Sequence, residues 1–307
     1  MSYTFALNIS KTPPFGPLLQ KLNYPDLRCS ELSDDESGGP AFVATFPSQA
    51  WPPGILHLFR EKVSTRGIEV ENSTTEMSVR FMTLCSEDDF ELGFKVLELL
   101  AACGDGIIRP EDGEPFPVQE LRQQFGSDWV RGQNESGMRA GMALAKKGDD
   151  VTIPGAIRNF YLGPRILQEL QAAPDAMRLK LLLDKLRGVQ FPGDEWFTAS
   201  VMEVKPKGAS PAFTCSAFAP NVDYLFGPVD FLMLDTGSED DYLFLPYEHL
   251  DNVAGEHSIA LDDKNRLVRK FSTQEWSAFL SRAEPFRKYP AGAMGAPKEK
   301  KWWQFWN

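Results

Sequence analysis

The sequence predicts an α+β fold, with antiparallel or mixed sheets and a central helical block. Segments with strand character gather in the first quarter and the last third of the chain, and helical periodicity is concentrated between them. Strands, then helices, then strands favour an α+β arrangement over a strictly alternating α/β one. The sequence contains no repeat of about 20–50 residues, which argues against solenoids and propellers.

The strand predictions rest on a period of two and on residue types that suit a pleated surface. Residues Tyr3 to Ile9 alternate in this way and open the chain as a strand. The hairpin prediction rests on residues 258–261 and 266–268, which flank the polar turn Asp262 to Asn265. The other predicted strands are 41–46, 68–70, 77–84, 150–153, 157–162, 197–204, 212–218, 231–234 and 242–245.

The strongest helical signal begins at Glu87, where Phe90, Phe94 and Leu97 recur at helical spacing. Ser86 is the expected N-cap, and Gly104 the expected stop. The other predicted helices are a short one around Leu18 to Leu22, 118–125, 136–147 (weakened by Gly137 and Gly141), 164–170, 176–186, and 273–281 with Ser272 or Thr273 as its cap.

Composition and periodicity suggest three regions. Residues 1–190 form an N-terminal α+β region, and residues 191–289 form a C-terminal β-rich region. The alternative is that both belong to one continuous domain. Residues 290–307 are a linker and a tail rich in Lys and Trp, hereafter the tail, because Pro, Gly and Ala dominate the stretch before the basic and aromatic residues.

The chain is acidic, with a net charge of −11 and an isoelectric point near 4.9. This charge disfavours nucleic-acid binding, which needs a basic surface, and fits a protein whose partner is basic. The four cysteines occur singly, which favours reduced thiols over a zinc site or a disulfide scaffold. The first residues lack the basic and apolar regions of a signal peptide, so we expect a cytoplasmic protein.

The common catalytic motifs are missing from the sequence, which contains neither G-x-S-x-G, a phosphate-binding loop, G-x-G-x-x-G nor H-E-x-x-H. We therefore expect neither a metal nor a cofactor, and a chain that is not an enzyme. Glu248 and His249 follow a predicted strand and are the weak catalytic candidates. The alternative function is a hydrolase-like enzyme around His249, with Asp112 contributing.

Two further groupings have a plainer interpretation. His57 and Glu61 would share a face if residues 56–63 were helical, and a surface pair is favoured there over a metal site. Asp105, Glu111, Asp112 and Glu114 lack the spacing of a calcium loop, so a solvated loop is expected.

Acidic loops and an aromatic tail are the candidate partner-binding features. The acidic residues could attract a basic protein, and the tail ends in four aromatic residues within five positions. The tail has three open alternatives: it folds back on its own domain, it anchors a protein partner, or it makes weak contact with a membrane surface. The candidate partner-binding residues are Asp34, Asp35, Glu36, Glu239, Asp240, Asp241, Trp302, Trp303, Phe305 and Trp306.

Residues Val79 to Leu84, the acidic helix start Ser86 to Phe90, and Gly106 to Ile108 resemble an uncharacterised family of bacterial proteins of about this length. The Lys- and Trp-rich end resembles those of small bacterial proteins encoded near polymorphic-toxin and type VI secretion genes. The resemblance covers residues 75–245 and the tail, and the family has no established catalytic residues. It implies a cytosolic immunity protein that neutralises a toxin.

Together these observations predict a non-enzymatic protein-binding role. The expected protein is a bacterial immunity or secretion-adaptor protein that acts by occluding a basic toxin or effector. The second alternative, after the enzyme, is a peripheral membrane protein anchored by the tail.

Overall fold

The computed structural model describes residues 2–9, 12–32, 41–42, 51, 54–73, 76–205, 211–238 and 241–288. The chain divides into an N-terminal unit, residues 1–192, and a C-terminal unit, residues 193–307. Both contain helices and sheets, so the predicted α+β class is confirmed. Among the described residues, no helix is long and apolar enough to cross a membrane.

The N-terminal unit is built on an eight-stranded sheet in the order β3-β2-β4-β5-β6-β1-β7-β8, in which every neighbouring pair is antiparallel. Its strands are β1 (Ser2–Ile9), β2 (Leu27–Leu32), β3 (Ala41–Phe42), β4 (Ile55–Arg60), β5 (Ile68–Asn72), β6 (Glu76–Met82), β7 (Gly104–Pro110) and β8 (Phe116–Pro117). The short helix α1 (Phe15–Gln20) lies between β1 and β2, as predicted.

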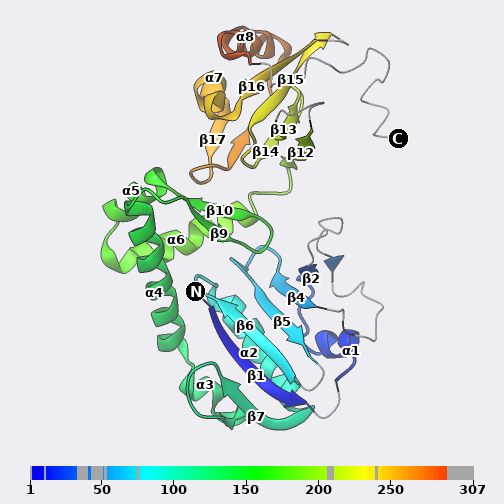
Figure 1. Cartoon of the computed structure of the whole chain (residues 1–307), viewed down its shortest axis with the longest axis vertical. Coiled ribbons are helices and arrows are strands. Elements are labelled where there is room, and N and C mark those ends of the chain that lie inside the picture. Colours follow the sequence, from blue (N-terminus) through cyan, green and yellow to red (C-terminus); the bar gives the residue numbers. More distant parts are fainter. Residues whose placement is uncertain are drawn as a thin grey trace. The chain divides into compact units, whose positions relative to one another are not determined.

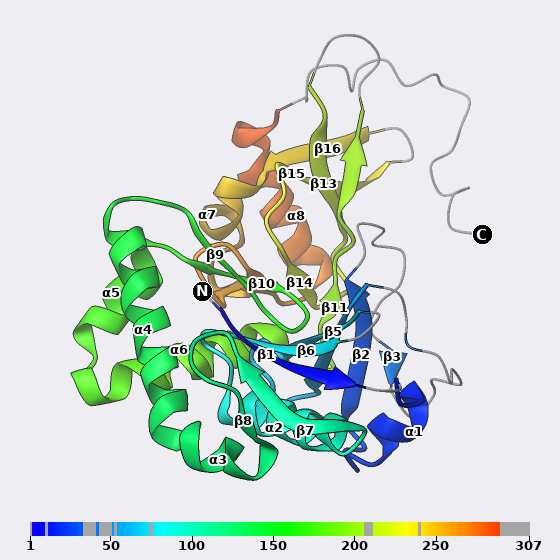
Figure 2. The ribbon, with the colours of Figure 1, turned by 60° about the horizontal axis from the view of Figure 1, so that its bottom comes forward.

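One face of this sheet is covered by helix α2 (Glu87–Ala101), as Figures 1 and 2 show. The aromatic rings of Phe81 and Phe90 stack at 5.0 Å between sheet and helix. The predicted N-cap is confirmed, because the Ser86 hydroxyl accepts from the Asp89 amide and the Asp89 carboxylate accepts from the Ser86 amide. The fully buried Asp89 also accepts from the Thr65 hydroxyl and from the amides of Thr65 and Arg66, which fixes the β4–β5 connection to the helix.

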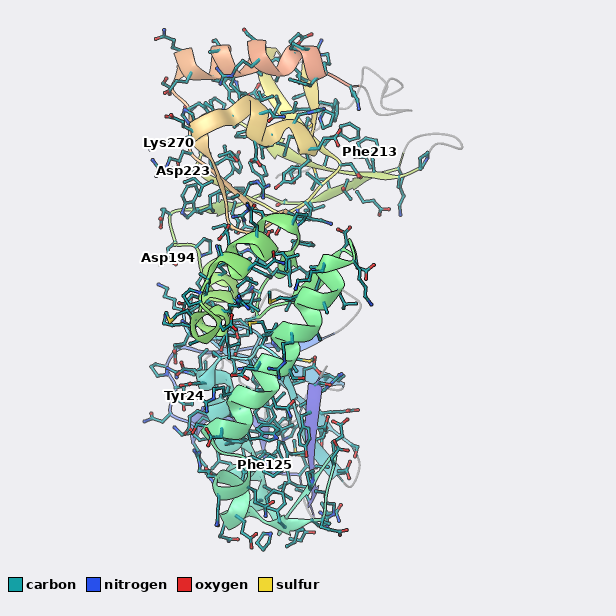
Figure 3. The ribbon with its side chains drawn as sticks, turned by 90° about the vertical axis from the view of Figure 1, so that its left-hand side faces the viewer. Tyr24, Phe125, Asp194, Phe213, Asp223 and Lys270 are labelled. Carbon is teal, nitrogen blue, oxygen red and sulfur yellow. The ribbon has the colours of Figure 1, made fainter. Side chains whose placement is uncertain are left out.

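The predicted helical block follows the sheet in sequence. It consists of the turn η2 (Val118–Glu120), α3 (Leu121–Gln124), α4 (Ser127–Lys146), the hairpin β9 (Val151–Pro154) and β10 (Asn159–Leu162), α5 (Pro164–Ala172) and α6 (Asp175–Gln190). Phe125, labelled in Figure 3, packs its ring against Phe5 at 4.8 Å and Trp129 at 5.0 Å. This cluster joins the start of the block to the core of the sheet.

The C-terminal unit contains two four-stranded sheets, in the orders β11-β14-β18-β17 and β12-β13-β15-β16. Each sheet includes one parallel pair, so both are mixed. Their strands are β11 (Phe197–Thr198), β12 (Met202–Val204), β13 (Phe213–Phe218), β14 (Tyr224–Phe226), β15 (Phe231–Ser238), β16 (Asp241–Pro246), β17 (Ser258–Ala260) and β18 (Arg266–Val268).

Helices α7 (Leu250–Ala254) and α8 (Thr273–Ala283) complete the core of this unit, with the turns η3 (Tyr247–His249), η4 (Gly255–His257) and η5 (Glu284–Phe286). Phe218 of β13 contacts the rings of Trp276 and Phe279 at 5.2 and 5.5 Å. Ser272 caps α8, as predicted. Asp223 accepts from the Lys270 amide and so ties the loop before β14 to the segment before α8 (Figure 3).

Three predicted elements need correction. The segment that contains His57 is strand β4 and not a helix, so His57 and Glu61 are not a helical surface pair. His57 is buried and donates from Nε2 to the Arg66 carbonyl at 2.6 Å, and Glu61 pairs with Arg28 at 3.0 Å. The predicted strand 197–204 is split between two sheets as β11 and β12.

The third correction concerns helix α4, which begins nine residues earlier than predicted. Its internal glycines lowered the helical signal, although one of them has a packing role. A Cβ atom at Gly137 would lie 2.6 Å from Cβ of Thr83, so the glycine permits a close approach of α4 to the end of β6. The N-terminal half of the helix carries few apolar residues, and packing of Val130 and Asn134 holds it.

Helix α4 gives a matched pair of stability predictions. Gly132→Ala should raise the free energy of unfolding by up to about 1 kcal/mol, because alanine favours helix and its Cβ would meet nothing within 4 Å. Gly137→Ala should lower it by about 1–3 kcal/mol, because the added methyl group overpacks against Thr83. Urea unfolding of the full chain measures both, and equal gains from the two variants would contradict the packing role.

His57 predicts a pH dependence of stability. Burial lowers the pKa of His57 below its ordinary 6.5, so the unfolded chain binds this proton more tightly than the folded one. The stabilisation is therefore complete above pH 6.5 and is lost as the pH falls toward the lowered folded value. His57→Gln keeps a donor for the Arg66 carbonyl and does not titrate. Between about pH 7.5 and 5.5 the wild type should lose more unfolding free energy than this variant, and parallel losses would contradict the assignment.

Candidate functional site

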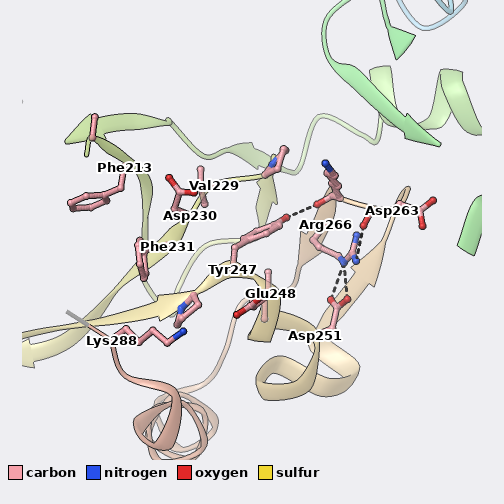
Figure 4. A pocket seen from close by; sticks show the side chains of 15 residues that line it. Phe213, Val229, Asp230, Phe231, Tyr247, Glu248, Asp251, Asp263, Arg266 and Lys288 are labelled. Carbon is pink, nitrogen blue, oxygen red and sulfur yellow. Dashed lines mark hydrogen bonds and ion pairs between the residues drawn. The ribbon is translucent and has the colours of Figure 1, made fainter. Parts of the chain in front are cut away.

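The candidate site is a pocket of about 750 Å³ in the C-terminal unit. Such a concave, open site is the default place to look for ligand or partner binding. Its lining comes from the start of β13, the β14–β15 connection, the end of β16, α7 and the turn of the β17–β18 hairpin (Figure 4). The pocket therefore exists only when both mixed sheets of the unit are assembled.

One wall of the pocket is apolar. Phe213 and Phe231 lie on neighbouring parallel strands with their ring centroids 5.6 Å apart and nearly perpendicular. Pro246 lies opposite Phe231 in the register of β15 and β16 and continues this wall. Phe231 is only half-buried, so this wall offers an apolar surface to a bound group.

The other wall is charged, and Figure 4 shows Arg266 at its centre. The Arg266 Nε atom lies 2.9 Å from both carboxylate oxygens of Asp251, and its Nη atoms donate to the carbonyls of Asp262, Asp263 and Asn265. The fully buried Asp262 accepts from the Lys264 and Asn265 amides and closes the hairpin turn. Arg266 is thus a structural clamp between α7 and the hairpin.

Two more polar groups of the pocket are occupied by the fold. Asp230 accepts from the amide and the hydroxyl of Thr214 at 2.7 and 3.0 Å, which fixes the β14–β15 connection against β13. The Tyr247 hydroxyl donates to the Lys264 carbonyl at 2.7 Å and joins η3 to the hairpin turn. These hydrogen bonds make the pocket walls rigid.

Glu248 is the predicted site residue that lines this pocket. Its side chain is 71% exposed, and its Oε1 atom lies 3.6 Å from the His249 Nε2 atom. His249 does not line the pocket, because its ring packs on Phe286 at 4.3 Å. Lys288 also lines the pocket and is exposed. Glu248 and Lys288 are therefore the charged groups placed to meet a bound partner.

The described lining consists of apolar, acidic and basic side chains and one phenol. Within the described part of the chain it contains no serine, threonine, cysteine or histidine, so a hydroxyl or thiol beside an imidazole is not available there. The described residues also contain no group of three side chains that could hold a metal ion. The pocket offers an apolar wall, a rigid charged wall and the exposed, opposite charges of Glu248 and Lys288.

The remaining sequence candidates lie elsewhere. Asp105 pairs with Arg109 at 2.9 Å, Glu111 accepts from the Thr4 amide, and the Asp112 carbonyl accepts from the Tyr3 hydroxyl, so these residues of the N-terminal unit serve its sheet. Asp34, Asp35, Glu36, Glu239, Asp240, Trp302, Trp303, Phe305 and Trp306 lie outside the described residues, and of Asp241 the structure describes the backbone in β16.

Sequence reasoning missed the aromatic wall, although a signal for it was present. Residues Phe231 to Leu234 and Tyr242 to Leu245 are apolar at every position instead of every second one. Such runs indicate a strand whose two faces are both apolar. Arg266 and Asp251 gave no comparable signal, because fifteen positions separate them and only the fold brings them together.

Comparison with known proteins finds a match for part of the chain. Residues 43–179 match a family described as a domain of unknown function, DUF4299. Among curated proteins and solved structures, nothing matches the chain. The matched segment runs from the early sheet of the N-terminal unit into α6, so the pocket of the C-terminal unit lies outside it. The family description names neither an activity nor a partner.

The clamp at Arg266 can be tested by local stability. Arg266→Gln should lower the opening free energy of the β17 and β18 amides by about 1–2 kcal/mol, because charge-assisted bonds are lost while Asp251 is half-exposed. Hydrogen exchange of the full chain measures this. The control Lys205→Gln breaks the exposed pair with Glu203 and should change these amides by less than about 0.5 kcal/mol. Equal protection of the β17 and β18 amides in both variants would contradict the structural role of Arg266.

Proposed function

We propose that this chain is a protein-binding molecule without an enzymatic role and that the pocket of the C-terminal unit receives a side chain of its partner. The single observation that carries the proposal is that the pocket's polar side chains differ in what they bind. Asp230, Asp251 and Arg266 are engaged in hydrogen bonds of the fold, and Glu248 projects outward beside an apolar wall. A preformed apolar recess rimmed by charge suits an anchoring side chain at a protein interface.

The partner we propose is basic. The chain carries a net charge of −11, and complementary charge speeds association and selects among partners. Within the pocket, Glu248 would face a lysine or arginine of the partner, and Phe213 and Phe231 would contact its apolar stem. Of the roles that fit, we favour an immunity or secretion-adaptor protein that occludes a basic toxin or effector. That role rests on the sequence resemblance and on the charge.

The test uses the tagged full-length chain and the protein that co-elutes with it stoichiometrically from its native lysate. Glu248→Lys should weaken binding to that protein at least tenfold, or about 1.4 kcal/mol, because it sets like charges against each other in the pocket. Ala212→Arg should do the same, because Ala212 is exposed on the lining and a longer side chain fills the recess. Titration calorimetry gives the dissociation constants.

The matched control is Glu256→Lys, which makes the same charge change at an exposed site of the same unit outside the pocket lining. Its affinity should stay within about twofold of the wild type, because distant surface charge has only a screened effect. If both Glu248→Lys and Ala212→Arg bound the partner with unchanged affinity, the pocket would be excluded as the binding site. If no protein co-eluted stoichiometrically with the tagged chain, the proposed binding function itself would be contradicted.

A further inference from the structure

The sheet β12-β13-β15-β16 has an apolar face that points away from the core of its unit. The core side of this sheet carries Leu232, Leu234 and Leu243, which pack with the residues of α7 and α8. Figure 1 shows α7 and α8 along that one side. In the register of the strands, the opposite side carries Met202, Val204, Phe213, Phe231, Met233 and Phe244, hereafter the outer face.

The outer face is a continuous patch. Met202 lies opposite Cys215, Cys215 opposite Phe231, and Met233 opposite Phe244, so apolar residues follow one another across all four strands. The rings of Phe213, Phe231 and Phe244 lie 5.6–6.5 Å apart as one cluster. Met202, Phe231, Met233 and Phe244 are only half-buried in the described structure. A contiguous and partly exposed apolar surface of this kind is typical of a binding surface.

Over strands β5 and β6, the sheet of the N-terminal unit has a polar face on the side away from α2. The side of its sheet opposite α2 carries Ser78, Arg80 and Glu69 at the positions that correspond to an outer face. Arg80 and Glu69 form an ion pair at 3.2 Å across a shallow hollow of about 290 Å³. A polar face of this kind needs no cover, whereas the outer face of the C-terminal unit does.

The segment that follows α8 lies next to the outer face. After α8 it returns to this sheet, where the Lys288 amide donates to the Phe244 carbonyl at 3.0 Å. Phe244 belongs both to the outer face and to the edge strand β16. Lys288 is the last described residue, so the described chain ends at the border of the patch, two positions before the tail.

The tail has the length and the chemistry to cover this patch. Thirteen residues lie between Lys288 and Trp302, so the distance from Lys288 to Trp302 can reach about 45 Å when the chain is extended. A four-stranded sheet is only about 14 Å wide. Trp302, Trp303, Phe305 and Trp306 can each bury roughly 150–250 Å². Asp235, on this side of the sheet, is acidic, and Lys298, Lys300 and Lys301 precede the aromatic run.

We propose that the outer face is the docking site of the chain's own tail, with the tryptophans of residues 302–306 seated on Met202, Met233 and Phe244. The proposal goes beyond the pocket and its partner and does not depend on them. The intramolecular arrangement is favoured because the exit at Lys288 holds the tail beside the face at a high effective concentration. The occupied face is then protected from other apolar surfaces.

The test is site-specific photocrosslinking in the full chain. With p-benzoylphenylalanine in place of Trp303, irradiation should join position 303 to peptides that contain Met202, Met233 or Phe244. A matched sample carries the same group in place of Met294, in the linker, and should give at least fivefold less of these products. Equal mixtures of isotopically heavy and light chains should yield cross-links within chains and not between them.

Two variants separate docking from chance proximity. Met202→Lys places a charge on the outer face and should lower the position-303 yield at least threefold. Glu203→Lys makes a comparable change on the next residue, which points to the opposite side and is exposed, and should leave the yield unchanged. Circular dichroism confirms that both variants fold, and a Met202→Lys chain that failed to fold would be replaced by Phe244→Lys at the edge strand.

The remaining outcomes overturn the proposal. If cross-links joined heavy to light chains as often as random pairing predicts, the outer face would be assigned to a second copy of the chain. Cross-links from position 303 to peptides of residues 1–192, or a yield equal to that from position 294, would show that the tail does not occupy the face. Co-sedimentation with vesicles of phosphatidylcholine and phosphatidylserine, with loss of the intramolecular product, would assign the tail to a lipid surface.

Discussion

The whole molecule is shaped by the fact that each of two principal sheets packs its helices on one side. In the N-terminal unit α2 covers one face of the eight-stranded sheet, and over β5 and β6 the other face carries charged and small polar residues such as Arg80 and Ser78. In the C-terminal unit α7 and α8 cover one face of the sheet β12-β13-β15-β16, and the other face is apolar. Water can solvate the polar region around Arg80 and is a poor solvent for the apolar outer face.

The pocket and the outer face meet at the same two side chains. Phe213 and Phe231 form the apolar wall of the pocket and one end of the outer face. The rigid side of the pocket depends on Arg266, whose bonds to Asp251 and to the hairpin carbonyls hold α7 and the β17–β18 turn together. In this unit aromatic side chains form the apolar surface, and Arg266 with Asp251 holds its shape.

Local patterns predicted the elements well where one segment decides its own structure. Helix α2 has its apolar stripe, its Ser86 cap and its acidic first turn in fifteen consecutive residues, and it was predicted nearly to its ends. The hairpin at Asp262 was predicted for the same reason. Predictions were wrong where a distant neighbour decides. His57 lies in a strand held by β2 and β5. The missed start of α4, residues 127–135, includes Asn134, whose side chain bonds to the backbone of Leu84 and Cys85.

The sequence by itself determined the α+β class, the capped helices, the acidic character and the aromatic tail, because each depends on composition or on residues close together in the chain. Only the tertiary structure decided the site. Of the predicted catalytic pair, Glu248 lines the pocket and His249 packs on Phe286, although the two are adjacent in sequence. The clamp of Arg266 on Asp251 and the aromatic cluster of Phe213, Phe231 and Phe244 join strands and helices from separate parts of the chain. Such contacts follow from how sheets pair and pack, and no local pattern encodes them.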